Sequence, residues 1–143
     1  MPDANAKLLV VDDEPLIRTT MSLVLGEIGY RVRSADNGIS ALREIHQEMP
    51  DILLSDLNMP GMSGFELLSL VDRRFPAIHK IAMSGAFFGS EVPSGVAADA
   101  FYQKGSGMET LLQIIERLPQ IPRRAAQPSS MTGLEQQQNQ LNF

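Results

Sequence analysis

The chain has 143 residues, of which 43% are hydrophobic and 20% charged, and its 12 Lys and Arg against 17 Asp and Glu give a net charge of -5. This length and balance are typical of one compact domain, and the acidity argues against a general nucleic-acid binder, which would carry a basic patch. The absence of cysteine excludes disulfides and thiolate metal sites, and two scattered histidines, His46 and His79, argue against a zinc site.

The N-terminal stretch MPDANAKLLVV reaches acidic residues after four consecutive apolar residues. That run is too short for the apolar region of a signal peptide or for a membrane span. We therefore expect a cytoplasmic protein with no membrane partner and no direct nucleic-acid partner.

Short apolar runs alternate with segments of helical periodicity along the chain. The runs cover residues 7–11, 30–35, 51–55, 79–84 and 99–103. This alternation predicts an α/β fold in which a parallel sheet is covered by helices.

The segments with helical periodicity have clear borders. We predict helices over residues 15–28, 38–49, 64–75 and 107–118. Proline at position 15 suits a first helical turn, and Gly29, Pro50 and Pro76 are typical of helix ends. The apolar faces of the first two helices include Leu16, Ile28 and Met49.

Two further segments depart from this pattern. Residues 84–98, SGAFFGSEVPSGVAA, contain three glycines and a proline, so the fourth of the five helices expected in such a fold should be short or irregular. Residues 119–143 are rich in Gln, Pro and Ser and poor in core-forming residues. We expect a domain over 1–118 and a flexible C-terminal tail over 119–143.

Acidic residues follow two of the apolar runs. Asp12, Asp13 and Glu14 come directly after the first run, and Asp56 follows the third. If these strands are neighbours in a parallel sheet, their acids meet at one edge. Carboxylates that share a cleft repel one another, and oxygen ligands without histidine or thiolate indicate Mg²⁺ or a similar divalent cation such as Mn²⁺.

Each acid also has a purely structural interpretation. The acids before Pro15 would cap a helix, and Asp56 would fit the turn that follows it. The occurrence of both groups at strand ends favours a functional site.

The fourth and fifth strands are expected to end at the same edge, with Ser84 and Lys104. A hydroxyl can donate to an oxyanion, and an ammonium can pair with a carboxylate or a phosphoryl oxygen. Together with the acids, these groups are typical of phosphoryl transfer to an aspartate, in which positioning and charge neutralisation carry the reaction.

This set of motifs resembles the receiver domain of two-component response regulators over about residues 7–118. LLVVDDEP resembles the family's first strand and acidic pair, DLNMPGMSG at 56–64 its phosphoacceptor loop, AMSGA its switch-hydroxyl strand and AFYQK its aromatic and lysine strand. The resemblance implies a flavodoxin-like, doubly wound, five-stranded parallel sheet of order 2-1-3-4-5 with helices on both faces.

The resemblance also implies a role for each acid. Asp56 would be the phosphoacceptor, and Asp13 and Asp56 would bind Mg²⁺ directly. Asp12 would bind the metal through water, and Asn58 through its backbone carbonyl.

Four other residues match positions of the family's motif. Ser84 would bond the phosphoryl group, and Lys104 would pair with it. Gly85 matches a small residue that leaves the site open to a donor. Phe101 matches the switch aromatic, although a phenylalanine in this strand also fits a plain core position.

Two features depart from the family's pattern. Lys104 is followed by Gly105-Ser106-Gly107 rather than by a cis proline, which frees the turn. Residues 85–98 replace the family's regular fourth helix. We predict that this segment is the most mobile part of the domain and becomes ordered upon phosphorylation or partner docking.

The function expected from these observations is a receiver that accepts a phosphoryl group from a histidine kinase or phosphotransfer protein and signals by binding another protein. It is expected to be a signalling domain that catalyses only its own phosphorylation and dephosphorylation, with a possible phosphorylation-linked homodimer. The alternatives are a pseudo-receiver with weak or no phosphorylation and an aspartyl-nucleophile phosphohydrolase. The second alternative is disfavoured because Asn58, rather than an acid, stands two residues after Asp56.

Overall fold

The computed structural model describes residues 6–86 and 91–120. Five parallel strands form one sheet in the order β2-β1-β3-β4-β5, as the resemblance implied. The strands are β1 (Lys7–Val11), β2 (Arg31–Ala35), β3 (Ile52–Asp56), β4 (His79–Ser84) and β5 (Ala100–Gln103).

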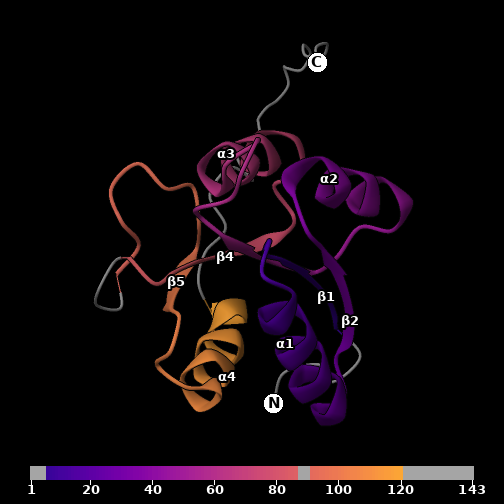
Figure 1. Cartoon of the computed structure of the whole chain (residues 1–143), viewed down its shortest axis with the longest axis vertical. Helices are drawn as coiled ribbons and strands as arrows, with labels where there is room; N and C mark the ends of the chain where they lie inside the picture. Colours follow the sequence, from indigo (N-terminus) through magenta and orange to yellow (C-terminus); the bar gives the residue numbers. More distant parts are fainter. Residues whose placement is uncertain (1–5, 87–90, 121–143) are drawn as a thin grey trace.

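Helices cover both faces of this sheet (Figure 1). The helices are α1 (Pro15–Ile28), α2 (Gly38–Gln47), α3 (Gly64–Arg74) and α4 (Met108–Arg117), and a short 3-10 helix (Leu118–Gln120) follows the last. Figure 1 places α1 and α4 on one face and α2 and α3 on the other, which is the doubly wound arrangement. Within the described residues, no helix is long and apolar enough to cross a membrane.

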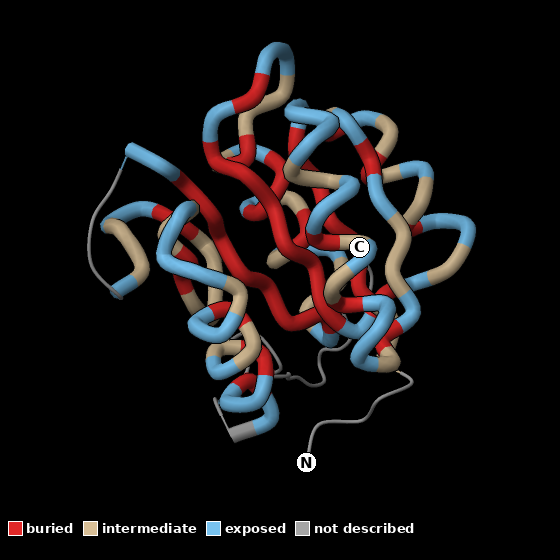
Figure 2. The backbone as a smooth tube through the Cα atoms, turned by 60° about the horizontal axis from the view of Figure 1, so that its bottom comes forward, coloured by how far each residue is buried: buried red, intermediate tan, exposed pale blue. Residues whose placement is uncertain are grey.

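The central strands are buried along their whole length (Figure 2). Alternate side chains of a strand point to opposite faces of a sheet. Accordingly, Leu9 and Val11 of β1 belong to the core under α2 and α3, whereas Leu8 and Val10 belong to the core under α1 and α4. This two-sided burial explains why these strands are continuous apolar runs in the sequence.

Local signals set most helix ends. A capping box starts α3, because the Ser63 hydroxyl accepts from the backbone N–H of Glu66 and the Glu66 carboxylate accepts from that of Ser63. Gly29 closes α1 with a φ of 123°. These borders agree with the predicted ones within two residues.

The apolar faces of the first two helices are narrower than the sequence predicted. Leu16 is 76% exposed, and Ile28 is also exposed. Met49 is exposed because α2 ends two residues earlier, at Gln47. Only Met21 and Leu25 of α1 are buried, and Ile17 packs against the same core as a partly buried residue.

The described residues between β4 and β5, 85–86 and 91–99, contain no helix. The prediction of a short or irregular fourth helix therefore understated the departure in this part of the segment. Gly95, with a φ of 83°, sits in a turn, and Val96 packs into the core under α2 and α3. Glycine and Pro93 disfavour helix, so Val96, with Val92 and Ala98 packed partly buried against the same core, takes the place of a helical face. The predicted mobility of 85–98 falls partly on 87–90, outside the described residues, and stays a prediction.

A buried ion cluster joins α3, β4 and the entry to β5, and we call it the amino-edge cluster (Asp72, Lys80, Asp99). The Lys80 ammonium, 2% exposed, lies 3.3 Å from Asp72 Oδ1 and 3.9 Å from Asp99 Oδ2, and it donates to the carbonyl of Ile78. Asp99 also accepts from the backbone N–H of Lys80 at 2.8 Å. The sequence analysis did not single out these residues.

The proposed border between domain and tail is only partly covered by the structure. Residues 119 and 120 belong to the 3-10 helix that extends α4. The remainder of the predicted tail lies outside the described residues, so the division at 118 stays a prediction.

Candidate functional site

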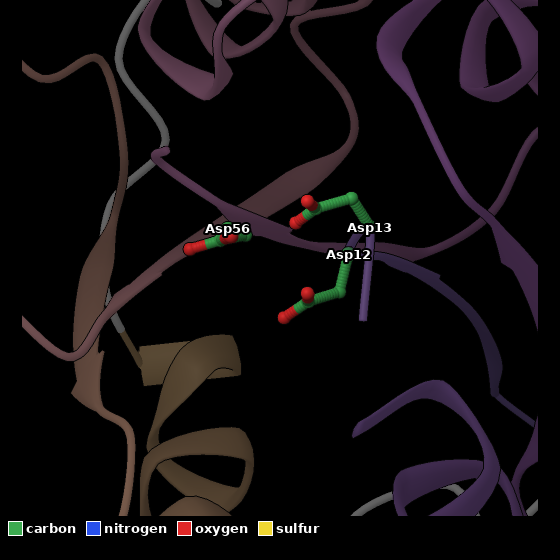
Figure 3. A group of neighbouring side chains, drawn as sticks. All are labelled: Asp12, Asp13 and Asp56. Atoms are coloured by element: carbon green, nitrogen blue, oxygen red, sulfur yellow. The ribbon is translucent and has the colours of Figure 1, made fainter. Parts of the chain in front are cut away.

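Three acids meet at the carboxyl edge of the sheet because β1 and β3 are neighbours. Val11 of β1 pairs with Ser55 of β3. The next residue of each segment, Asp12 and Asp56, therefore lies at the same level of the sheet. Carboxylate oxygens of Asp12, Asp13 and Asp56 lie within 4.8 Å of one another. Figure 3 shows the Asp12 and Asp13 side chains extending to the same side, toward the end of β3.

The loop after Asp56 is folded tightly against it. The backbone N–H of Gly64 donates to the carbonyl of Leu57 at 3.0 Å, and that of Leu57 donates to Met83 at 2.9 Å. A Cβ atom at position 64 would overlap the Asp56 carbonyl oxygen, so only glycine fits there. The sequence DLNMPGMSG thus fixes the backbone of Asp56 from both sides.

Lys104 brings a positive charge to the acids. Its backbone N–H donates to the Ser84 carbonyl at 3.0 Å, which carries the side chain to the edge. The ammonium lies 2.8 Å from Asp12 Oδ2, 3.3 Å from Asp56 Oδ1 and 3.3 Å from Glu14 Oε1. We call Asp12, Asp56 and Lys104 the carboxyl-edge cluster.

The electrostatics of this cluster are unbalanced toward negative charge. Burial, followed by the charge of Asp12, raises the pKa of the Asp56 carboxyl, and Lys104 only partly opposes this. Burial would lower the pKa of the Lys104 ammonium, but contact with Asp12 and the charges of Asp56 and Asp12 raise it above its usual range. Lys104 is therefore a fixed cation at neutral pH.

The acids fit a divalent cation. Asp12 Oδ2 is buried and has no hydrogen-bond donor within the described residues, although the Lys104 ammonium lies at ion-pair distance. With Asp13 and Glu14 included, four carboxylates face one ammonium, so an additional positive charge would relieve their repulsion. An oxygen-only set of this kind suits Mg²⁺.

The contacts of Asp12 and Glu14 show how far these acids act as caps of α1. Glu14 is the N-cap of α1 and makes no side-chain capping bond. Asp12 Oδ1 accepts from the Glu14 backbone N–H at 2.9 Å, which shapes the turn before α1. One oxygen of Asp12 thus serves the turn, whereas the other faces Lys104 and is available to a metal.

Ser84 and Asn58 lie next to each other at this edge. Asn58 Nδ2 donates to Ser84 Oγ at 3.3 Å, and the same oxygen accepts from the backbone N–H of Ala86 at 2.9 Å. Asp56 pairs with Met83 in the sheet, which places Ser84 one residue beyond the level of Asp56. The structure therefore brings Ser84 and Asn58 to the edge, with the hydroxyl engaged by its own loop.

The remaining predicted residues lie around the acids rather than among them. Phe101 is 2% exposed and belongs to the core under α2 and α3 together with Val96. Gly85 is exposed, and a Cβ atom there would meet nothing within 4 Å. The sequence analysis did not predict the contact of Glu14 with Lys104. The sequence offered one hint of this contact, namely that Glu14 is a third acid directly after β1.

Comparison with known proteins identifies the architecture. A profile of the response regulator receiver domain matches residues 8–116. The chain belongs to this family. As a receiver, it is similar to the chemotaxis response regulator CheY4 of Vibrio cholerae, with 31% identity, a TM-score of 0.73, and coverage of 80% of this chain and 98% of that one.

Another similar receiver is TrrA of Thermotoga maritima, whose structure contains Mg²⁺ and BeF. The identity is 30% and the TM-score 0.72, with 79% of this chain and 98% of that chain covered. TrrA has also been solved in complex with the histidine kinase ThkA.

Some curated relatives are longer proteins. This receiver is 29% identical over 120 residues to the transcriptional activator ExaE of Pseudomonas putida, covering 78% of this chain and 54% of that protein. It is 35% identical over 97 residues to the transcriptional regulator NtrC of Escherichia coli, covering 68% of this chain and 19% of that protein. The receiver thus matches only part of each.

Proposed function

We propose that this receiver accepts a phosphoryl group on Asp56 from a phosphohistidine of a histidine kinase or phosphotransfer protein, and then signals through protein–protein contacts. The observation that carries the proposal is the convergence of Asp12, Asp13 and Asp56 beside the ammonium of Lys104, which lies 3.3 Å from Asp56 Oδ1. This combination leaves Asp56 ready to act as a nucleophile once its neighbours are neutralised.

In the proposed step, an Asp56 carboxylate oxygen forms a bond to phosphorus while the phosphorus–nitrogen bond of the donor breaks. The electron pair of that bond returns to the imidazole, and Asp56 becomes an acyl phosphate. Lys104, 3.3 Å from Asp56 Oδ1, is placed to balance the charge of the phosphoryl oxygens. Hydrolysis of the acyl phosphate would make the domain a catalyst of its own phosphorylation and dephosphorylation only.

Asp12, Asp13, Asp56 and the Asn58 carbonyl are the groups proposed to hold Mg²⁺, or Mn²⁺ in its place. The bound cation supplies charge neutralisation for the carboxylates and the transferred oxygens. The carboxylates repel one another, and Lys104 only partly offsets this repulsion, so a bound cation would stabilise the site.

Ser84 and Phe101 are proposed to report the phosphorylated state. Ser84 would exchange its contacts with Asn58 and Ala86 for a bond to a phosphoryl oxygen. The movement of this loop would repack the buried Phe101 ring, which favours one of two arrangements of the β4–β5 region.

The partner predictions are supported by similarity to TrrA, which has been solved in complex with a histidine kinase. The downstream partner, homodimer formation and the cytoplasmic location stay predictions. A phosphohydrolase is disfavoured because Asn58 offers no side-chain proton transfer two residues after the nucleophile. A pseudo-receiver would lack a complete acid set, whereas this chain has one.

The test is incubation of the whole chain with Mg²⁺ and acetyl phosphate, followed by mass measurement. We expect one added phosphoryl group on the wild type and none on Asp56→Asn. The matched control is Glu27→Gln, which removes an exposed carboxylate near the C-terminal end of α1 and should be phosphorylated like the wild type.

Two outcomes would contradict the proposal. A wild type that gains no phosphate and gives no spectroscopic response to beryllofluoride would favour the pseudo-receiver. Turnover of a generic phosphoester that is abolished in Asp56→Asn would favour the phosphohydrolase.

A further inference from the structure

The turn that carries Lys104 has no residue that restricts its backbone. Lys104 is followed by Gly105, Ser106 and Gly107, and both glycines have positive φ angles, 90° and 100°. Glycine reaches such conformations readily but also leaves them readily, because it has no Cβ. Backbone bonds hold the first part of the turn, from Lys104 to the Ser84 carbonyl and from Ser106 to the Gln103 carbonyl. The end of the turn at Gly107 needs another restraint if the backbone that carries the ammonium is to stay at one place.

Side-chain hydrogen bonds tie the turn to the strand before it. The Tyr102 hydroxyl donates to the carbonyl of Gly107 at 3.2 Å, and Ser106 Oγ donates to the carbonyl of Gln103 at 2.7 Å. The Gly107 carbonyl also accepts the first backbone bond of α4, from Leu111 at 3.4 Å. Tyr102 therefore connects β5 to both the end of the turn and the start of α4.

The Tyr102 ring is a rigid support for this bond. It is 4% exposed and packs in the core under α1 and α4. Lys104 comes two residues later, just after the end of β5, and both residues line the same cavity next to α1. A tyrosine fixed in a core loses little further freedom when its hydroxyl bonds a carbonyl.

Packing alone does not hold the turn. A cavity of about 270 Å³ lies between the turn and α1, lined on the turn side by Tyr102, Lys104, Gly105, Gly107 and Met108. The glycines therefore have space into which the turn could move.

We propose that Tyr102 is a positioning residue for Lys104, because its hydroxyl holds the glycine turn that sets where the ammonium lies. This inference rests on the proposed function, since it gives Tyr102 a role in the phosphorylation of Asp56. The Tyr102 hydroxyl restrains the backbone after Lys104, as the ring of a proline at the next position would do.

The experiment uses Tyr102→Phe in the whole chain, phosphorylated by acetyl phosphate with Mg²⁺. We expect the rate to fall about fivefold, the change that the net effect of one hydrogen bond supports. In a Lys104→Met background, the same substitution should have no further effect on the residual rate, because the positioned group is gone.

Controls separate positioning from general stability. Tyr30→Phe alters another buried tyrosine of the same core, distant from the turn, and should leave the rate unchanged. Ser106→Ala removes the hydroxyl bond from Ser106 to the Gln103 carbonyl and should slow phosphorylation in the same direction, even if Tyr102→Phe folds poorly.

A readout independent of phosphorylation is the NMR signal of the Lys104 ammonium, whose protons should exchange with water faster in Tyr102→Phe. An unchanged rate and an unchanged ammonium signal would overturn the inference, as would an equal loss of rate in the Lys104→Met background. If no variant is phosphorylated but the ammonium signal still changes, the proposed function fails while the positioning of Lys104 by Tyr102 stands.

Discussion

Two clusters in this molecule are built from the same residue types, two aspartates and one lysine, at opposite edges of the sheet. In the amino-edge cluster the ammonium is enclosed by α3, β4 and the entry to β5, and it contacts both carboxylates and the Ile78 carbonyl. Each cluster contains one buried carboxylate oxygen that accepts no hydrogen bond within the described residues, Asp72 Oδ1 here and Asp12 Oδ2 at the other edge. In the carboxyl-edge cluster the exposed acids Asp13 and Glu14 add negative charge that one lysine does not balance.

The difference shows that residue type alone does not decide whether an ion cluster is structural or chemical. A closed cluster with its donors used stabilises the fold only as long as every member is present. A cluster that remains short of positive charge and is open on one side can be completed from outside. Substitutions should therefore cost stability at the amino edge and function at the carboxyl edge.

The largest expected effect breaks the amino-edge cluster. Lys80→Met leaves Asp72 and Asp99 without their shared cation, which should lower the free energy of unfolding by about 3–5 kcal/mol. Urea unfolding at neutral pH measures this. The control Lys7→Met breaks a partly exposed pair with Glu48 and should cost less than about 1 kcal/mol. A Lys80→Met variant as stable as the wild type would remove the structural role of the cluster.

A smaller effect sharpens the chemical side of the comparison. Mg²⁺ at ten times its dissociation constant should stabilise the wild type by about 1.4 kcal/mol in thermal unfolding, because it binds only the folded pocket. Asp13→Asn should lose this increment, whereas Asp72→Asn, at the other edge, should keep it. Equal stabilisation of Asp13→Asn by Mg²⁺ would place the metal elsewhere.

The smallest effect is a difference in sign between matched substitutions. Without Mg²⁺ at neutral pH, Asp56→Asn should raise the free energy of unfolding by about 1 kcal/mol, because it removes a repelled buried charge. Asp99→Asn should lower it, because the Lys80 ammonium loses a partner.

The pH dependence of Asp56→Asn follows from the raised pKa of Asp56. The protonated acid is favoured in the fold, so its stabilising contribution is complete below the usual value of 3.8 and is lost as the pH rises through the raised pKa. The advantage of Asp56→Asn should therefore appear over that interval and be absent below it. Chemical unfolding of the wild type and Asp56→Asn at a series of pH values measures this difference. A stability advantage of Asp56→Asn that grows as the pH falls would contradict the prediction.

Local patterns were sufficient for the strands and for the acids at their ends, since the apolar runs end in Asp12 and Asp56. The strand order, which puts β1 beside β3 and so brings the acids together, was predicted only from the resemblance to the receiver family. The borders of α3 were predicted from its apolar periodicity and from Pro76, whereas the capping box of Ser63 and Glu66 was not singled out in the sequence.

The parts that could not be predicted depend on contacts between distant segments. Lys80 looked like one polar residue in an apolar strand, and nothing local connects it to Asp72 and Asp99. The bond from Tyr102 to Gly107 requires the geometry of a glycine turn that the sequence leaves open. The absence of helix in 91–99 was visible only as a weakened signal, because glycine and proline disfavour a helix without specifying what replaces it.

Gly64 offers a way to study this receiver without touching its charges. Because a methyl group there would collide with the carbonyl of Asp56, alanine at this position would displace the end of β3 while every ionisable group remained present. The variant would relate the reactivity of the Asp56 carboxylate to its position alone. It would separate what distance contributes from what electrostatics contributes in a single methyl substitution.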